Sequence, residues 1–160
     1  MGPSAGEQQR QALITSLRLL AATPKSRKTL EKKLEAKGYL PKVVERTLDH
    51  LEEKGLMNDR ALALSLIQSL VTQRPSGRRR IAYELERRGI ARTVVNEILE
   101  KYSVEDERRC ALELAVQRWE RWRNEEIPRR RKKTYDFLVR RGFDFSLARD
   151  VTDTLHHGKT

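Results

Sequence analysis

The most informative residues of this chain are its arginines and lysines, because their number and spacing suit them to bind anions. Of 160 residues, 34 are basic and 23 are acidic, which gives a formal net charge of +11. Two undiluted basic runs occur, at residues 78–80 and 129–133. A guanidinium group can donate two parallel hydrogen bonds to one phosphate or carboxylate. The composition therefore favours a polyanionic partner.

The basic excess is confined to two stretches of the chain. Residues 74–92 hold seven basic side chains against two acidic ones, and residues 118–141 hold ten against four. The remainder is balanced in charge, and the related stretch at residues 25–37 is diluted by Glu31 and Glu35. We predict as contact residues Arg74, Arg78, Arg79, Arg80, Arg87, Arg88, Arg129, Arg130, Arg131, Lys132, Lys133, Arg140 and Arg141.

Helix stability alone does not account for the two runs. A charged helix face is usually a solvated face, and this stays an alternative for residues 25–37. The runs at 78–80 and 129–133 stand where helices are expected to start, and cations there oppose the helix dipole. An extended basic strip is typical of nucleic-acid binding. An acidic groove on another protein is the alternative partner.

Two tryptophans lie among the arginines of the second stretch. Trp119 and Trp122 are three residues apart, beside Arg118, Arg121 and Arg123. Stacking on the bases of a single strand is one interpretation. The other is a place in the core, which we favour for Trp119 because it continues an apolar helical pattern. The role of Trp122 stays open.

Side chains for catalysis or metal binding are scarce, so we expect neither an enzyme nor a cofactor. One cysteine, Cys110, allows no internal disulfide and no multi-cysteine metal cluster. His50 and the pair at residues 156–157 lack the spacing of a metalloprotease motif. The terminal Gly158-Lys159-Thr160 has the form of a phosphate-loop ending, but Asp153 stands where that motif needs a glycine. We interpret it as a polar tail.

The apolar segments are too short for export or for membrane insertion. No run reaches the length of a signal peptide or the roughly 18 apolar residues of a membrane-spanning helix. We therefore expect a cytoplasmic protein without a membrane partner. A monomer is expected.

The basic stretches belong to a repeated element with a glycine at its centre. A basic residue, a glycine and a large apolar residue recur as Lys37-Gly38-Tyr39, Arg88-Gly89-Ile90 and Arg141-Gly142-Phe143, at intervals of 51 and 53 residues. A leucine precedes each glycine by four positions, and an apolar residue follows it by five. A glycine between two apolar stripes is typical of a left-handed helix cap. A period of this length predicts a repeat protein.

A third helix is expected before each of these helix pairs. Apolar residues recur at helical spacing within 63–71, and the pattern is similar in 13–20 and 111–122. Helix starts are predicted at Asn58, Ser103 and Pro128. The predicted fold is all-α, with nine helices in three tandem three-helix repeats that form an elongated, curved stack. The predicted repeats are residues 1–57, 58–102 and 103–160.

These motifs resemble those of the RecX family of bacterial recombination regulators. Residues 74–90 resemble the family's central signature, which has a glycine, a basic residue, an apolar residue, then Glu-Leu and a basic-Gly-Ile ending; Gly77 and Glu84-Leu85 stand at its first and fourth elements. Asn58 replaces the usual first acid of the family's link into the second repeat. The resemblance runs from about residue 10 to residue 155. Its other segments, in family order, are residues 34–39, 51–63 and 137–143.

The resemblance implies a more specific function than the composition alone indicates. RecX-like proteins are non-enzymatic modulators of RecA, the recombinase that polymerises on single-stranded DNA. By resemblance, this chain would lie in the groove of the RecA–DNA filament and inhibit ATP hydrolysis and strand exchange. The implied partners are the RecA filament and single-stranded DNA, with double-stranded DNA as a further candidate.

A function of another class stays open. Three-helix units also build helix-turn-helix repressors that read a DNA sequence. The recognition helices would start near Pro41, Ala91 and Phe145. The stretches that follow Pro41 and Ala91 offer few of the Asn, Gln or paired Arg residues that read bases. We therefore favour the RecA regulator over the repressor.

Overall fold

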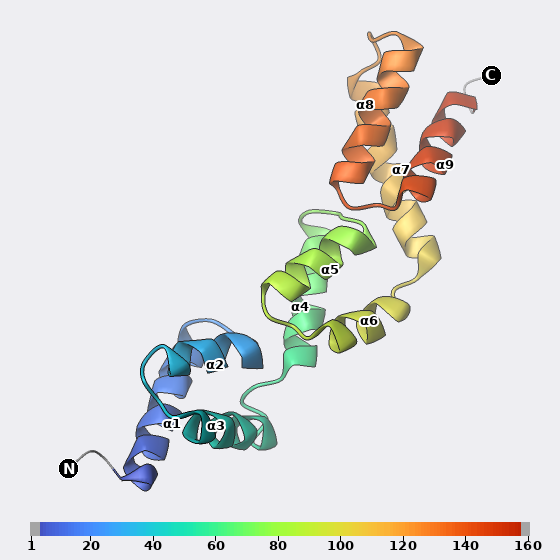
Figure 1. The fold of residues 1–160 in the computed structure, drawn as a ribbon. Coiled ribbons are helices and arrows are strands. Elements are labelled where there is room, and N and C mark those ends of the chain that lie inside the picture. Colours follow the sequence, from blue (N-terminus) through green and yellow to red (C-terminus); the bar gives the residue numbers. More distant parts are fainter. Residues whose placement is uncertain (1–3, 158–160) are drawn as a thin grey trace. The chain divides into compact units, whose positions relative to one another are not determined.

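The computed structural model describes residues 4–157, and the regular structure of these residues is entirely α-helical. Three triplets of helices follow one another along the chain (Figure 1). The first triplet is α1 (Ala5–Ala22), α2 (Arg27–Glu35) and α3 (Pro41–Glu53). The second is α4 (Asp59–Thr72), α5 (Arg78–Arg87) and α6 (Arg92–Glu100). The third is α7 (Val104–Arg121), α8 (Ile127–Arg140) and α9 (Phe145–His157).

This architecture confirms the predicted all-α fold of tandem three-helix repeats. The predicted helix starts are also confirmed. The Ser103 hydroxyl accepts the backbone N–H of Asp106, and Oδ1 of Asn58 accepts that of Ala61 over 3.0 Å. Pro128 lies in the first turn of α8. The terminal Gly158-Lys159-Thr160 lies outside the described residues.

The three repeated glycines close the middle helix of each triplet in a left-handed conformation, as predicted. Gly38, Gly89 and Gly142 have φ angles of 86°, 83° and 84°. The residue after each glycine donates its N–H to the carbonyl of the leucine four positions before the glycine. This pattern is a Schellman cap, and it satisfies a carbonyl that the helix end leaves unpaired. The leucines, all fully buried, are Leu34, Leu85 and Leu138.

The described residues form two compact units. The first contains the chain up to residue 65 together with residues 85–94. Within it α1 packs on α2 and α3, and α2 packs on α3 (Figure 1). The core residues of this unit are Leu30, Leu34, Val44, Leu48, Leu51 and Met57.

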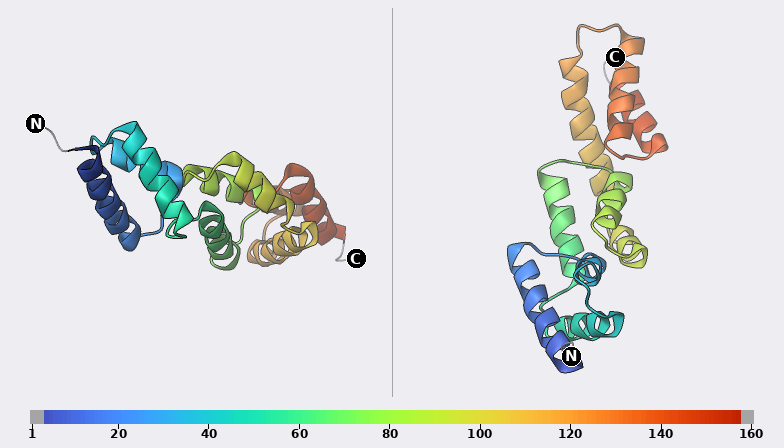
Figure 2. Two further views of the ribbon diagram at one scale, coloured as in Figure 1. Left: turned by 90° about the horizontal axis from the view of Figure 1, so that it is seen from below. Right: turned by 60° about the vertical axis from the view of Figure 1, so that its left-hand side comes forward.

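The second unit contains residues 66–84 and the chain from residue 95. Helices α7, α8 and α9 all contact one another in it (Figure 2). Trp119 on α7 is only 2% exposed, so the core interpretation of this residue is correct. Trp122 packs against the same core and stays partly exposed. The core residues are Ala111, Leu114, Ala115, Phe137, Leu138, Phe143, Ala148 and Val151.

In the first unit, the glycine cap of α5 also serves as a contact between repeats. The Ser26 hydroxyl, at the start of α2, donates to the carbonyl of Arg88 over 2.7 Å. The Thr29 hydroxyl donates to the same carbonyl over 3.1 Å. A Cβ atom on Gly89 would lie 2.5 Å from the Ser26 oxygen, closer than such atoms approach. A glycine is therefore required at position 89, both because φ is positive there and because the Ser26 hydroxyl leaves no room for a Cβ atom.

The second unit repeats this contact with the cap of α8. The N–H of Gly77, at the position equivalent to Ser26, donates to the carbonyl of Arg141 over 2.9 Å. The N–H of Arg79 donates to the carbonyl of Gly142 over 3.1 Å. A Cβ atom on Gly142 would overlap the Cβ and backbone nitrogen of Arg80. The start of α5 thus lies directly against the end of α8.

An acidic side chain completes each contact, and sequence patterns did not reveal it. In the first unit, Oδ1 of Asp59 accepts the backbone N–H of Arg27 over 2.8 Å. In the second, Oε1 of Glu107 accepts the backbone N–H of Arg78 over 2.8 Å. Each arginine is the first residue of its helix, where the N–H has no partner within the helix. A carboxylate from the next repeat supplies that partner.

Candidate nucleic-acid interface

Arg78 is a structural residue, although its position in a basic run predicted a contact with an anion. Its Nε–H donates to Oε2 of Glu107 over 2.8 Å, and Glu107 is buried. Its other nitrogens donate to the carbonyls of Leu99, over 3.1 Å, and Tyr102. Together with the hydrogen bond from the backbone N–H of Arg78, these side-chain hydrogen bonds connect the start of α5 to the end of α6 and to the start of α7. The guanidinium is thereby occupied within the second unit.

Arg130 is also turned inward. It is 5% exposed, and its Nε–H donates to the carbonyl of Trp119 over 2.7 Å. Its guanidinium carbon lies 4.2 Å from the centre of the Trp119 ring, which is a cation–π contact. Oε1 of Glu120 lies 3.7 Å from the guanidinium. Arg130 therefore joins α8 to α7 and presents little surface to a partner.

The other members of the run at 129–133 are paired with carboxylates. Glu125 accepts a hydrogen bond from Lys133, which lowers the pKa of Glu125, and it also forms an ion pair with Arg129 over 3.1 Å. Lys132 reaches Asp136 over 2.6 Å. Exposed pairs of this kind contribute little to stability, so a stronger anion can displace the carboxylate. The run is thus less basic than its sequence indicates, but it is still accessible.

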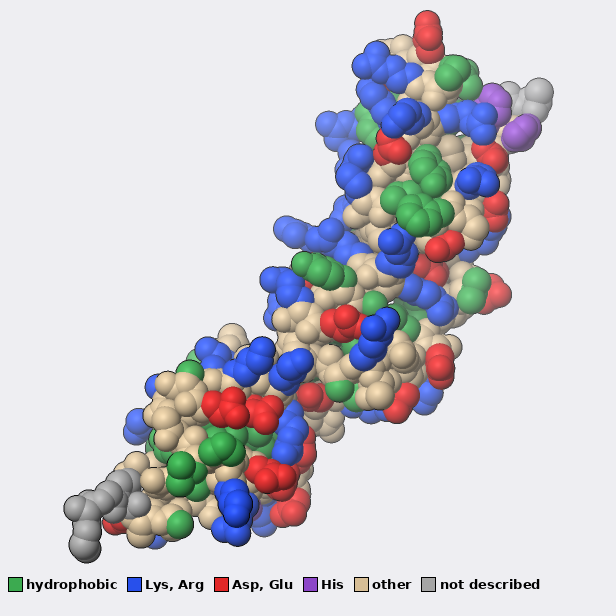
Figure 3. Space-filling model, in the orientation of Figure 1, with side chains coloured by type: hydrophobic (Ala, Val, Ile, Leu, Met, Phe, Trp, Pro, Cys, Tyr) green, Lys and Arg blue, Asp and Glu red, His purple; other side chains and the backbone are tan. Residues whose placement is uncertain are grey.

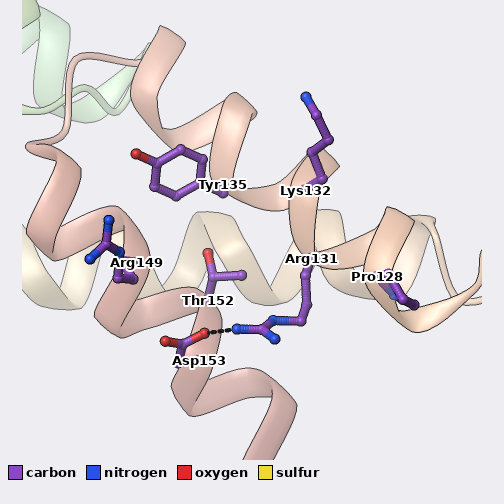
Figure 4. Close-up of a pocket in the computed structure, with 7 residues that line it drawn as sticks. All are labelled: Pro128, Arg131, Lys132, Tyr135, Arg149, Thr152 and Asp153. Atoms are coloured by element: carbon purple, nitrogen blue, oxygen red, sulfur yellow. Dashed lines mark hydrogen bonds and ion pairs between the residues drawn. The ribbon is translucent and has the colours of Figure 1, made fainter.

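Arg131 lines a pocket of about 450 Å³ between α8 and α9 (Figure 4). Figure 4 shows Lys132 pointing away from the other lining side chains, while Arg131 reaches the carboxylate of Asp153. Tyr135 and Arg149 lie at the other end of the pocket. The pocket thus holds acidic and basic side chains together, and Asp153 already pairs with Arg131.

Two predicted residues, Arg87 and Arg88, belong to the first unit. Both side chains line a pocket of about 360 Å³ together with Ser26, Thr29 and Leu62. The Arg88 carbonyl already accepts the two hydroxyls at the start of α2. The Arg88 residue as a whole is exposed.

The remaining predicted residues keep their charge available. Arg74, Arg79 and Arg140 are at least partly exposed, Arg141 is half-buried, and no carboxylate of residues 4–157 forms an ion pair with these four. Arg80 reaches Glu84 at 3.6 Å. Lys and Arg side chains gather along one edge of the third helix triplet (Figure 3).

Arg118 is a candidate that the basic runs did not predict. It lies within the basic stretch at 118–141, but it stands alone between uncharged or acidic neighbours. Its guanidinium carbon lies 4.4 Å from the centre of the Phe137 ring, and that of Arg141 lies 5.5 Å from the same centre. The sequence held one signal for this pairing of Arg118 with Arg141, since Arg141 belongs to the repeated basic–glycine–apolar motif.

Residues 4–157 offer neither a metal site nor a membrane segment. Their His, Cys, Asp and Glu side chains form no group of three that could hold a metal ion. Within the same residues, none of the helices combines the length and apolar character that crossing a membrane requires.

The fold and the surface together define an all-α protein of tandem three-helix repeats with an arginine-rich face. Residues 12–51, 58–99 and 105–152 match, in order, the first, second and third three-helix domains of RecX. The chain belongs to the RecX family of regulatory proteins.

Several RecX proteins are similar to this chain over most of its length. The regulatory protein RecX of Chlorobium phaeobacteroides is 32% identical over 151 residues, which cover 94% of this chain and 97% of that protein. The RecX protein of a Mycobacterium species is 33% identical over 152 residues, covering 92% and 83% of the two chains.

Two solved structures share the fold. The crystal structure of RecX from Lactobacillus salivarius superposes with a TM-score of 0.86 at 18% identity, covering 95% of this chain and 99% of that one. A second crystal structure of a regulatory protein RecX superposes with a TM-score of 0.79 at 26% identity, covering 92% and 74%.

Proposed function

We propose that this protein is a negative regulator of the RecA recombinase. It binds in the groove of the RecA–DNA filament and inhibits ATP hydrolysis and strand exchange, and so limits recombination and DNA repair by RecA. It acts by binding and catalyses no reaction. The observation that carries the proposal is the match of all three RecX domains in order along the chain.

The charge distribution supports the same proposal. A filament of protein on DNA presents phosphates and acidic side chains, and arginine binds both. In the second unit, Arg74, Arg79 and Arg140 reach solvent without an ion pair to the described residues. A face of this kind gains free energy from a long polyanion because each contact releases a counterion.

The test is the DNA-stimulated ATPase of RecA, measured as this protein is added up to the concentration of RecA. We expect the rate to fall, and we expect the double variant Arg79→Glu/Arg140→Glu to inhibit about tenfold less per mole, because both reversed charges face solvent. Arg109→Glu is the matched control, since Arg109 is exposed but already paired with Asp106. An ATPase rate that the wild-type protein leaves unchanged would refute the proposal.

A further inference from the structure

Two arginines of the second unit share one fixed aromatic ring. Arg118, from α7, and Arg141, at the end of α8, lie with their guanidinium carbons 4.4 and 5.5 Å from the centre of the Phe137 ring. Phe137 is 9% exposed and belongs to the core, so its ring cannot move away. The ring holds both guanidinium groups in place, which reduces the conformational entropy that a ligand must overcome.

The contact between α5 and α8 brings two more arginines to the same place. Because Gly142 has no side chain, the backbone of Arg80 lies directly against it. The N–H of Gly77 donates to the carbonyl of Arg141, which ties the segment before α5 to the end of α8. Arg74 belongs to that segment, and its carbonyl accepts the Ser76 hydroxyl over 2.7 Å.

These four residues, Arg74, Arg80, Arg118 and Arg141, are called here the arginine cluster. Of the four, Arg80 alone forms an ion pair with a carboxylate of the described residues, that of Glu84 at 3.6 Å. Burial, and next the charges of the other three members, lower the pKa of Arg141. Like charges held together in this way favour a bound anion.

An exposed aromatic residue lies beside the cluster. Phe145, the first residue of α9, is 50% exposed, and the guanidinium of Arg79 lies 4.6 Å from the centre of its ring. Arg79 is joined to the cluster because its N–H donates to the Gly142 carbonyl. Proteins that bind single strands combine cations along the phosphates with aromatic rings under the bases. An acidic protein surface would not need the exposed ring.

We propose that the arginine cluster binds the phosphodiester backbone of a single-stranded nucleic acid, with Phe145 as a platform for a base. The proposal rests on the proposed function and deepens it, since it names the residues that contact the strand on which RecA assembles. Each guanidinium fork can take one pair of phosphate oxygens.

The experiment measures the binding of fluorescein-labelled oligothymidine by anisotropy over a series of salt concentrations, without RecA. We expect Arg118→Gln/Arg141→Gln to weaken binding roughly tenfold, and the slope of log affinity against log salt to fall by about 0.7 for each phosphate that the variant no longer neutralises. Phe145→Ala should weaken binding several-fold and leave the slope unchanged. The matched control is Arg108→Gln/Arg109→Gln, which removes two exposed charges of α7 outside the cluster.

Any one of three outcomes would overturn the proposal. The first is a folded Arg118→Gln/Arg141→Gln variant, with wild-type circular dichroism, that keeps both affinity and salt slope. The second is a Phe145→Ala variant that binds oligothymidine like the wild type, and the third is a wild-type protein that binds polyglutamate more tightly than oligothymidine. If the double variant does not fold, the test uses the reactivity of Cys110 in the wild-type protein. Cys110 is a half-buried thiol, and the charge of Arg141 acts to lower its pKa. Saturating oligothymidine should then slow the alkylation of Cys110, and an unchanged rate would reject the site.

The outcome is independent of the test for RecA regulation. A protein that inhibits the RecA ATPase but binds oligothymidine without the cluster would keep the proposed function and lose this site. A protein that binds oligothymidine through the cluster but leaves the ATPase unchanged would keep this site and lose the proposed function.

Discussion

The carboxylate of Glu107 accepts both the backbone N–H and the Nε–H of Arg78, each over 2.8 Å. This pair joins the first helix of one repeat to the second helix of the repeat before it. Asp59 makes the same backbone contact with Arg27 in the first unit, where the guanidinium turns instead to Asp49 and Glu52. Adjacent arginines of one basic run therefore have different roles, since Arg78 holds the fold and Arg79 faces solvent.

Removal of the carboxylate of Glu107 should destabilise the protein. Glu107→Ala leaves the N–H and the half-buried guanidinium of Arg78 without their acceptor, and we expect a loss of about 2–3 kcal/mol. Urea unfolding followed by circular dichroism measures it. Asp106→Ala is the control, because Asp106 forms an exposed pair with Arg109 and should cost at most about 1 kcal/mol. Equal losses in the two variants would contradict the structural role of Glu107.

Two glycines with the same φ angle should respond differently to alanine. Gly38 and Gly142 have φ angles of 86° and 84°, so each alanine costs about 1–2 kcal/mol of backbone strain. A Cβ atom meets nothing within 4 Å at Gly38 but overlaps Arg80 at Gly142. We therefore expect Gly142→Ala to cost about 2 kcal/mol more than Gly38→Ala. Thermal unfolding compares them, and equal midpoints would rule out the contact between α5 and α8.

Reversal of adjacent charges should separate folding from binding. Arg78→Glu places a carboxylate against buried Glu107, so we expect a loss of at least about 3 kcal/mol. Arg79→Glu should leave the unfolding midpoint within about two degrees of the wild type and weaken binding to RecA filaments about three- to tenfold. Thermal melts and filament binding measure the two effects. An Arg79→Glu variant with a lowered unfolding midpoint and normal filament binding would contradict the binding role given to Arg79.

The pH dependence of Cys110 reports on its surroundings. Burial, and next the charges of Glu113 and Glu107, raise the pKa of the Cys110 thiol, and Arg141 opposes them. The thiolate is the reactive form, so alkylation by iodoacetamide should still be accelerating at about pH 9, where an ordinary thiol of pKa about 8.5 is levelling off. Arg141→Gln should slow alkylation further.

The same shift has a consequence for stability. Because the pKa of Cys110 is higher in the folded than in the unfolded chain, its neutral thiol contributes stability that is fully present below the unfolded pKa. This contribution is lost as pH rises through the folded pKa. Cys110→Ser should lessen the fall in stability on the alkaline side. An alkylation profile that matches the urea-unfolded protein would contradict the raised pKa.

The repeat of leucine, glycine and apolar residue was enough to predict the second and third helices of each triplet, because helix caps depend on residues close in sequence. The contacts between repeats were not predictable in this way. Ser26 and Gly77 occupy equivalent positions yet use a hydroxyl and a backbone N–H for the same purpose, so no shared residue type marks them. The role of an arginine also depends on residues distant in sequence. Arg130 lies in the most basic run of the chain and is buried against Trp119.

Co-sedimentation with RecA filaments tests the central proposal most directly. RecA is assembled on single-stranded DNA, and the pelleted fraction of this protein is compared with that on the same DNA without RecA. Regulation through the filament groove predicts that the filament retains more protein than bare DNA and that Arg79→Glu/Arg140→Glu reduces this fraction. Equal pelleting with and without RecA, or pelleting with neither, would contradict it.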